Sequence, residues 1–524
     1  MFEYDAKSSA ILVALLLYST SVLAVEFNVT TDLVVQTGQP APDGNGVFSD
    51  TLLFPVLNDQ SQVLIWARLL ATSDPGLLDD WGFFLADRQG AAKVFRGGDP
   101  SAQGNALRMD PQSLAPNTPA LSRPYALDAS GRALVVAPDT SAAFAIYRSE
   151  AGSSEVLVQE GDLTPIGALT DVAATIPLTF SANNMGQAIF SGFVTLDDQP
   201  SRTGVFRTDT TAIDPLIFSG QSLPDSRTVA NLGFQGSAFN NAGQAAAIFN
   251  TVGTPFDFGV YSSDGTTLDK MLHSGEPAPD GLGTLIAGAL LSPQINNNGK
   301  MLTLFSVDDI TQDYLGLFTS SSSGLIEVTR TGASIPTGSV FNFTGDIRIN
   351  DNDTLVYGAI VATPEGNRNQ LLMRHAGVTL EIATAFDTLP EPIGLEIRDP
   401  FTFALNEEDQ VLFSAFVIAE GLSRQALFLF DPEHGLALVA RSGQPFANNV
   451  LAEIQIALPR ATNTMRYSQN AHTGFNNNGE AAYYFRLENG QAGVALTEVE
   501  FVVDRPDELF GDRFELIEGK QGPR

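Results

Sequence analysis

The residue types that carry most enzyme chemistry are scarce in this sequence. It contains four histidines, His273, His375, His434 and His472, and no cysteine. No two histidines stand at metal-ligand spacing, and neither an H-E-x-x-H nor a G-x-S-x-G motif occurs. The lack of cysteine excludes disulfides, thiolate nucleophiles, iron–sulfur clusters and Cys-bound zinc. His273 and His434 adjoin repeated strands, so we expect structural roles for them.

Carboxylates, by contrast, are abundant. Sixty Asp and Glu face 28 Lys and Arg, which gives a formal net charge of −32. Such a chain repels the phosphate backbone of nucleic acid and an anionic membrane surface. A carboxylate pair for glycoside hydrolysis is available, but nothing in the sequence singles one out. Asp43, Asp225 and Asp280 recur after turn prolines, where they form either a cation-binding ring or, as we favour, solvated turn residues. We expect no cofactor and no metal.

A repeated unit must position any site. A turn that starts with Asn and has Gly three residues later precedes an apolar strand again and again. The clearest copies begin at Asn183, Asn240, Asn296 and Asn476, and weaker copies begin at Asn58, Asp128, Asn350 and Asn406. From Asp128 to Asn406 the copies are 54 to 57 residues apart, and the first and last steps are 70 residues. Asn and Gly tolerate the left-handed conformation, so each copy predicts a tight hairpin turn.

Two further signatures keep the same period. In every unit a second kind of turn follows a strand, and a proline stands two or four residues after the first residue of that turn. The first residue is Phe386 in one unit and glycine in the other seven: Gly38, Gly98, Gly161, Gly220, Gly275, Gly332 and Gly443. A short strand such as Gly-Val-Phe at 204–206 recurs between the two kinds of turn. Each unit therefore carries about four strands. An alternative for residues 350–353, Asn-Asp-Asn-Asp, is a calcium loop, but a calcium hand needs a longer set of oxygens.

Four short strands in about 55 residues match the size of a propeller blade. The last unit stops at its third strand, near residues 493–497, whereas residues 33–35 form a spare strand before the first unit. We therefore predict an all-β, single eight-bladed β-propeller, closed by the N-terminal strand completing the last blade, because this arrangement leaves no open sheet edge. A seven-bladed ring with an odd unit is the nearest competitor. A propeller that binds a quinone cofactor is expected to carry a tryptophan docking motif in most blades. This sequence has two tryptophans, Trp66 and Trp81, so it does not fit that class.

The repeat resembles the bacterial secreted "choice-of-anchor" proteins with tandem NxxGxxAF repeats, over nearly the whole chain after its leader. Asp128, Asp353 and Asp409 depart from the motif without breaking the period. The resemblance implies export and a surface location, and it carries no assigned activity. The segment 507–515 is similar to an acidic F-x-D-G-F-E sorting signal, with Arg513 in place of the glycine; an unstructured acidic tail is the alternative.

The first residues predict the compartment. Lys7, the apolar run at 10–18 and a V-x-A site ending at Ala24 are typical of a signal peptide, while an uncleaved anchor is the alternative. We expect a signal peptide at 1–24, the eight-repeat propeller at 25–500 and an acidic tail at 501–524. The protein is expected to be secreted or at the cell surface, to be a monomer and to have no transmembrane segment after cleavage.

Two insertions depart from the repeat. The gap between the turn glycine and the Asn turn widens in the second unit, from Gly98 to Asp128, and in the eighth, from Gly443 to Asn476. Both units neighbour unit one in a closed ring, so the insertions are expected to meet on one face. They contain Arg108, Arg123, Tyr125, Arg460, Arg466, Tyr467 and His472. We predict a recognition patch there for an acidic or carbohydrate ligand; the alternative is loops that cover a blade junction.

Two functions remain from the sequence. The first is an exported, non-enzymatic module that binds a protein or carbohydrate, or interacts with a surface. The second is a secreted polysaccharide-acting hydrolase or lyase with its site on the face that carries the insertions. A deep pocket with clustered carboxylates from several blades would favour the enzyme, and a shallow, uniform channel would favour the binding module.

Overall fold

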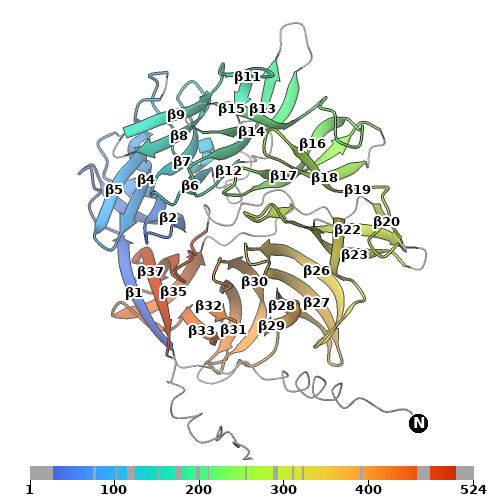
Figure 1. The fold of residues 1–524 in the computed structure, drawn as a ribbon. Helices are drawn as coiled ribbons and strands as arrows, with labels where there is room; N and C mark the ends of the chain where they lie inside the picture. Colours follow the sequence, from blue (N-terminus) through green and yellow to red (C-terminus); the bar gives the residue numbers. More distant parts are fainter. Residues whose placement is uncertain are drawn as a thin grey trace, which may run out of the picture.

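The computed structural model describes residues 27–74, 78–101, 103–114, 124–150, 153–172, 180–195, 201–209, 212–253, 257–281, 283–286, 293–309, 312–321, 324–389, 393–456 and 473–502. Their strands form eight small antiparallel sheets arranged in a ring (Figure 1). The fold is therefore an eight-bladed β-propeller, as the repeat predicts. Most of the predicted signal peptide and acidic tail lies outside the described residues. Within the described ranges, no helix is long and apolar enough to cross a membrane.

The first four blades follow the chain in order. Blade 1 contains β2 (Val47–Leu57), β3 (Val63–Leu70), β4 (Trp81–Asp87) and β5 (Gly90–Arg96), and blade 2 contains β6 (Tyr125–Leu127), β7 (Ala133–Pro138), β8 (Phe144–Glu150) and β9 (Ser153–Gln159). Blade 3 contains β10 (Leu163–Thr164), β11 (Gly167–Val172), β12 (Phe180–Ala182), β13 (Ala188–Thr195), β14 (Arg202–Thr208) and β15 (Ile213–Phe218). Blade 4 contains β16 (Val229–Phe239), β17 (Ala245–Thr251), β18 (Phe258–Ser263) and β19 (Leu268–His273).

The remaining blades continue the same pattern. Blade 5 contains β20 (Gly283–Ile286), β21 (Gln294–Ile295), β22 (Met301–Asp309), β23 (Tyr314–Ser321) and β24 (Gly324–Arg330). Blade 6 contains β25 (Ser334–Ile335), β26 (Gly338–Ile349), β27 (Leu355–Thr363), β28 (Gly366–His375) and β29 (Val378–Thr384), and blade 7 contains β30 (Glu396–Leu405), β31 (Val411–Ala419), β32 (Leu422–Asp431) and β33 (Gly435–Arg441). Blade 8 contains β34 (Pro445–Phe446), β35 (Asn449–Ile456), β36 (Ala481–Leu487) and β37 (Ala492–Phe501). Two short helices, η1 (Leu78–Asp80) and α2 (Pro111–Leu114), lie between strands.

The N-terminal strand closes the ring. Strand β1 (Phe27–Gln36) pairs antiparallel with β37 of blade 8, in register from Phe27 opposite Phe501 to Gln36 opposite Gly493 (Figure 1). Main-chain hydrogen bonds thus join the first and last parts of the chain, and the edge of β37 is covered. The prediction that the spare N-terminal strand completes the last blade is confirmed.

The hydrophobic core consists of eight separate clusters, one between each pair of neighbouring blades. Each blade has two buried faces because alternate side chains of a strand point to opposite sides of the sheet. The aromatic residues of the repeat lie in these clusters; Phe190 and Phe206, for example, stack with ring centroids 5.6 Å apart. Gly204 is needed beside them, since a Cβ there would lie 2.8 Å from the ring of Phe206.

The order of strands defines two faces of the ring. We name the four main strands of a blade A to D in chain order. Because neighbouring strands are antiparallel, the A–B and C–D turns share one face, which we call the turn face, and the B–C and D–A connections share the other, the connection face. The Asn turns are A–B turns. The turn glycines and the first insertion lie in D–A connections. The second insertion interrupts strand A of blade 8 instead, since residues 457–472 follow β35.

Candidate functional site

The first residue of each Asn turn holds the turn in shape. In blade 8, the side-chain oxygen of Asn476 accepts hydrogen bonds from the backbone N–H groups of Asn478 at 3.1 Å and Glu480 at 2.9 Å. An Asn side chain that bonds to the backbone two residues on imitates a backbone turn. The fourth residue has a left-handed conformation, with φ of +76° at Gly479. Position 1 and position 4 of the turn therefore explain the repeated Asn and Gly.

The same asparagines join the blades into a ring. Asn240 Nδ2 in blade 4 donates to the backbone carbonyl oxygen of Asn296 in blade 5 at 2.8 Å. The equivalent bond occurs at seven of the eight junctions, at 2.8–3.2 Å, including the closure, where Asn476 donates to Asn58. These donors are buried, and an unmet buried donor or acceptor costs about 1–3 kcal/mol. The Asn motif thus connects blades as well as turning the chain.

The eighth junction, between blades 2 and 3, uses a different pair of side chains. Asp128 stands at position 1, and its carboxylate has no N–H to donate. Arg132, at position 5 of the same turn, donates from Nε to Asp128 Oδ2 at 2.6 Å and from Nη2 to the carbonyl oxygen of Met185 in blade 3 at 3.2 Å. The Asp–Arg pair therefore makes the inter-blade connection that one Asn amide makes elsewhere.

A second circle of contacts lies beside the first. The side chain at position 2 of a turn accepts a hydrogen bond from the position 2 backbone N–H of the preceding blade at six junctions, at 2.7–3.0 Å. The accepting residues are Asn241, Asn297, Asp351, Glu407, Asn477 and Asp59. The other two junctions are those of blade 2. The methyl group of Ala129 accepts no hydrogen bond from blade 1, and its own N–H donates to the backbone carbonyl oxygen of Asn184 at 3.2 Å.

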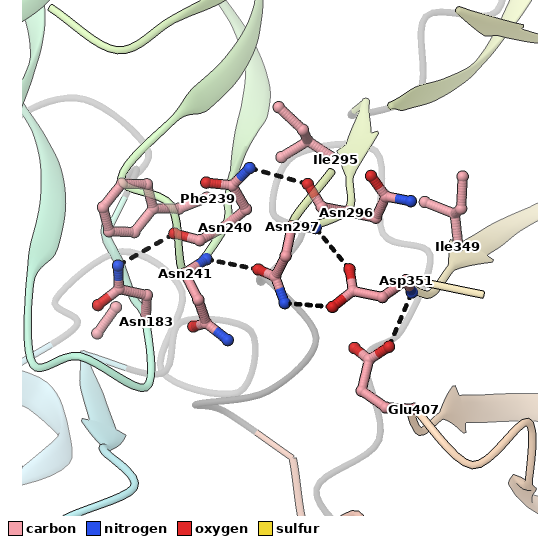
Figure 2. Close-up of a pocket in the computed structure, with 11 residues that line it drawn as sticks. Asn183, Phe239, Asn240, Asn241, Ile295, Asn296, Asn297, Ile349, Asp351 and Glu407 are labelled. Atoms are coloured by element: carbon pink, nitrogen blue, oxygen red, sulfur yellow. Dashed lines mark hydrogen bonds between the residues drawn. The ribbon is translucent and has the colours of Figure 1, made fainter. Parts of the chain in front are cut away.

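Two small hollows lie over this double ring. The first encloses about 310 Å³ and is lined by turn residues of blades 3 to 7; Figure 2 shows Asn241, Asn297, Asp351 and Glu407 in succession along it. The second encloses about 250 Å³ and lies at the junctions of blade 2, beside Asp59, Ala129 and Asn184. Both hollows belong to the axial end of the turn face.

The carboxylates of the first hollow are already engaged. Asp351 accepts from the backbone N–H and the side-chain amide of Asn297, both at 2.7 Å, and Glu407 accepts from the backbone N–H of Asp351 at 2.7 Å. In the described part of the chain, no group of three or more His, Asp or Glu side chains is placed to hold a metal ion. Among the residues 350–353 that suggested a calcium loop, Asp351 and Asp353 accept hydrogen bonds from blade 5, and Asn350 Oδ1 accepts from the backbone of its own turn. The carboxylates of Asp351 and Glu407 therefore serve contacts between blades.

Of the seven residues of the predicted ligand patch, the structure describes two. Arg108 is exposed on the connection face. Tyr125 is fully buried between blades 1 and 2, where its ring packs against Trp66 and Phe83 and its hydroxyl donates to the carbonyl oxygen of Phe54 at 2.9 Å. Tyr125 thus contributes packing at this junction. The others, Arg123, Arg460, Arg466, Tyr467 and His472, lie outside the described residues.

The described ends of both insertions contact blade 1. Tyr125, after the first insertion, bonds to β2 through Phe54, and the backbone N–H of Leu57 in β2 donates to the carbonyl oxygen of Thr473, after the second insertion, at 2.8 Å. The first insertion also packs inward, since the indole N–H of Trp66 donates to the carbonyl oxygen of Met109 at 2.9 Å. The described ends of the two insertions therefore both contact strand β2.

The aspartates after the turn prolines are ion-paired. Asp43, Asp225 and Asp280 lie 2.7, 2.5 and 2.7 Å from guanidinium nitrogens of Arg96, Arg227 and Arg330, respectively. Burial alone would raise the pKa of Asp225, but hydrogen bonds from the backbone and side chain of Arg227 hold that pKa below its ordinary value. These carboxylates are therefore compensated within the fold, in contrast to the solvated residues that we favoured.

Three histidines are described, and each contacts an aspartate. His273 is fully buried, with Nδ1 3.4 Å from Asp257 and Nε2 3.3 Å from the hydroxyl of Thr251. That hydroxyl is itself buried and donates to Asp257 at 2.6 Å, so this Thr–His–Asp group is closed to substrate. His375 and His434 lie near Asp409 and Asp431 through Nδ1. The structural roles expected for His273 and His434 agree with these contacts, and His472 lies outside the described residues.

Comparisons with known proteins place the chain in a family. Residues 94–502 match the model of a family of unknown function, DUF7453, and the chain belongs to it. Among curated proteins, none matches the chain. Solved structures with a similar fold include Porphyromonas gingivalis dipeptidyl peptidase 4, at 10% identity and TM-score 0.43 over 93% of this chain and 67% of that one. Others are the polysaccharide lyase Uly1 (9%, 0.33, 80% and 100%) and the Dos1 propeller (7%, 0.37, 89% and 95%).

Proposed function

For a member of this family, we propose that the protein is an exported, non-enzymatic β-propeller that acts as a binding or surface-interaction module. The observation that carries the proposal is the ring of hydrogen-bonded turns at the axis, in which seven of eight junctions use an Asn amide. Its hollows are small, and the carboxylates of Asp351 and Glu407 accept hydrogen bonds from neighbouring turns. Groups that must stay bonded to hold the ring together are unsuited to exchanging protons with a substrate.

The site formed by the two insertions is the proposed ligand site. Its loops are carried by blades that three different contacts tie together: the inter-blade cores, the Asn ring and strand β1. Binding residues commonly lie on loops of such a rigid scaffold. The patch of Arg108, Arg123, Arg460, Arg466, Tyr467 and His472 is proposed to contact the ligand; Tyr125 anchors one end of it through its buried ring. The ligand is a carbohydrate or a protein.

Export and surface location belong to the same proposal. They are supported by the signal-peptide pattern before Val25, by the absence of cysteine and by the resemblance to secreted repeat proteins. Sequencing the N-terminus of the protein recovered from the medium or the cell surface tests this part. A mature protein that starts at Val25 supports export, and an intact N-terminus on cytosolic protein contradicts it.

Glycan-array screening of the mature chain, with and without calcium, tests whether the ligand is a carbohydrate. Capture of proteins from the cell surface tests whether the ligand is a protein. We expect saturable binding to one class of ligand without conversion of it. Release of shorter oligosaccharides from a bound glycan would contradict the non-enzymatic function. The variant Arg460→Ala/Arg466→Ala/Tyr467→Ala is expected to weaken binding, and unchanged affinity would remove this patch from the ligand site. Arg202→Ala, on blade 3, is a matched control for loss of a partly exposed arginine.

A further inference from the structure

The D–A turns contain one residue that breaks the repeat at a conformational cost. At seven of these turns a glycine has φ between +83° and +91°. Phe386 occupies the same place after blade 6, with φ of +73°. Its backbone makes the same bond as the glycines do: its N–H donates to the carbonyl oxygen of Ile397 at 2.6 Å, as that of Gly332 does to Val340 at 2.6 Å. The turn is thus conserved in shape within the chain, and only the side chain differs.

No packing requirement explains this phenylalanine. A Cβ placed on the equivalent glycines, except Gly443, meets no atom within 4 Å, so a side chain at this position projects into open space. Accordingly, the side chain of Phe386 is 51% exposed. A left-handed conformation costs an ordinary residue about 1–2 kcal/mol, and a bulky residue is a genuine outlier there. Such strain persists at places where it serves binding or catalysis.

A guanidinium lies beside the exposed ring. The Arg398 Cζ lies 5.4 Å from the centroid of the Phe386 ring, a cation–π distance. Arg398 Nε is 3.0 Å from Glu396 Oε1, and no other ion pair of Arg398 occurs in the described part of the chain. The side chain of Arg398 is 44% exposed. Its terminal nitrogens are therefore available to an acceptor from solution.

Among the described residues, the surroundings of the ring are polar and carry charges of both signs. Besides Arg398 and Glu396, the nearby Asp387 pairs with Arg368 across the same connection. The apolar area of a single aromatic ring, surrounded by ion pairs, is much smaller than the roughly 800 Å² that each partner buries in a stable protein interface. The ring alone is therefore too small to be a protein interface. The net charge of −32 disfavours a nucleobase on a polyphosphate chain. What fits is one ring-shaped ligand that is apolar on its faces and rich in oxygen at its edge.

We propose that Phe386 and Arg398 form a sugar-binding site, in which a pyranose ring stacks on the exposed part of the phenyl ring and its oxygens accept hydrogen bonds from Arg398. The aromatic face is electron-rich and attracts the polarised C–H groups of a sugar. An uncharged sugar offers hydroxyl oxygens to the guanidinium, and a uronate offers a carboxylate. The inference deepens the proposed binding function and rests on it. The site lies on blades 6 and 7 of the connection face, apart from the insertions at blades 2 and 8.

Restoring the glycine of the repeat gives a test that does not endanger the fold. Phe386→Gly relieves the strained conformation, so its melting temperature should equal or exceed that of the natural sequence, while its affinity should fall at least about tenfold because a buried aromatic contact is lost. The probes are neutral gluco-oligosaccharides and oligo-uronates, measured first on an array and then by titration calorimetry. Phe386→Tyr should retain binding, and Phe386→Ala should lose it. Ala376→Gly, which relieves φ of +48° in the C–D turn of blade 6, is the control.

Arg398→Gln identifies the sugar. It should weaken binding of oligo-uronates at least about tenfold and that of neutral oligosaccharides only slightly, since a carboxylate gains most from a guanidinium. Glycan binding that Phe386→Gly leaves unchanged overturns this site and leaves the proposed function standing. Absence of any glycan binding by the natural sequence also overturns the site, and the proposed function then falls only if no protein partner is captured either.

Discussion

The junctions between blades 4 and 5 and between blades 5 and 6 join the same kind of turn with different side chains. At the first, Asn240 Nδ2 donates to Asn296 of blade 5 and to Gln244 Oε1 of its own turn, at 2.8 and 2.9 Å. Gly299, at position 4 of the next turn, leaves room for Gln244; a Cβ there would lie 3.1 Å from Oε1. At the second, position 5 is Lys300, which cannot accept a hydrogen bond.

The missing acceptor comes from the other side of that junction. Asp353 replaces glycine at position 4 of blade 6, accepts from Asn296 Nδ2 at 3.4 Å and pairs with Lys300 Nζ at 3.0 Å. Between blades 6 and 7, Thr354 stands at position 5 and Asp409 accepts from Asn350 Nδ2 at 2.6 Å. Position 5 of one turn and position 4 of the next are therefore matched, and the departures of Asp353 and Asp409 from the repeat are compensations.

The closing junction, between blades 8 and 1, combines both solutions. Glu480 at position 5 accepts from Asn476 Nδ2 and from the hydroxyl of Ser61, both at 2.7 Å; Ser61 occupies the glycine position of blade 1 with φ of +60°. Glu480 also lies 2.8 Å from Arg88, which in turn pairs with Asp32 of strand β1. Here the turn contacts and the closing strand support each other, so this junction depends on a segment that is distant in the sequence.

The largest expected effect follows from removing that support. Deleting residues 26–35 takes away Leu33, Val34 and Val35 and uncovers the edge of β37, at a cost of about 5 kcal/mol from three apolar side chains alone. We expect a sharp drop in melting temperature and loss of cooperative unfolding. Differential scanning calorimetry measures both, with deletion of residues 1–24 as the control. An unchanged melting temperature would show that the pairing of β1 with β37 does not stabilise the ring.

The next effect compares the two kinds of junction directly. Asn240→Ala removes a buried amide and should cost about 2–4 kcal/mol. Asn350→Ala removes the equivalent amide and its bond to Asp409 Oδ1, a charged acceptor where Asn240 has the neutral Gln244, so it should cost about 1 kcal/mol more. Chemical denaturation measures both free energies of unfolding. Asn489→Ala, at an exposed turn, should be nearly neutral; equal costs at Asn240 and Asn350 would contradict the distinction.

Converting the junction of blades 5 and 6 into the arrangement of blades 4 and 5 tests whether Lys300 and Asp353 compensate for each other. Asp353→Gly alone removes an acceptor and the partner of Lys300, and is expected to cost about 1 kcal/mol. Lys300→Gln together with Asp353→Gly rebuilds the arrangement of blades 4 and 5 and should recover most of this loss. A double-mutant cycle is therefore expected to give a coupling energy of about 1 kcal/mol. Additive single effects would argue that the two positions are independent.

The smallest effect is a pH dependence at the glycine junction between blades 3 and 4. Arg207 donates to the carbonyl oxygens of Gly243 and Asp264 and so holds the C–D turn of blade 4 against this junction. Backbone hydrogen bonds, first from Thr267, lower the pKa of Asp264 from 3.8 to about 2. Because the folded-state pKa is depressed, the stabilisation is present above about pH 4 and is lost as the pH falls to about 2. The melting temperature of the natural sequence should therefore exceed that of Asp264→Asn near neutrality, and this difference should shrink across that window; a constant difference would contradict the assignment.

Much of the fold could be read from the residues. The Asn turns, the Gly-Val-Phe strands and the spare strand at residues 33–35 predicted eight four-stranded blades and their closure, and the structure confirms both. Tyr125 shows the limit of the same reasoning. An aromatic residue in a polar insertion suggested a ligand contact, but neighbouring Trp66 and Phe83 bury it. The sequence shows polar residues at position 2 of the Asn turns, such as Asp351 and Glu407, and in the structure these residues form the axial ring. Their neighbours in the sequence do not indicate which groups they bond to.

The sequence by itself determined the turns, the strands and the number of blades, because these depend on residues within a few positions of one another. A left-handed Gly or an Asn that bonds to its own backbone acts over four residues. Only the tertiary structure decided which carbonyl takes each Asn amide, why Lys300 is matched by Asp353, and that Phe386 faces solvent beside Arg398. Those partners are separated by a unit of the repeat or by a whole connection, and they meet only when the ring has closed.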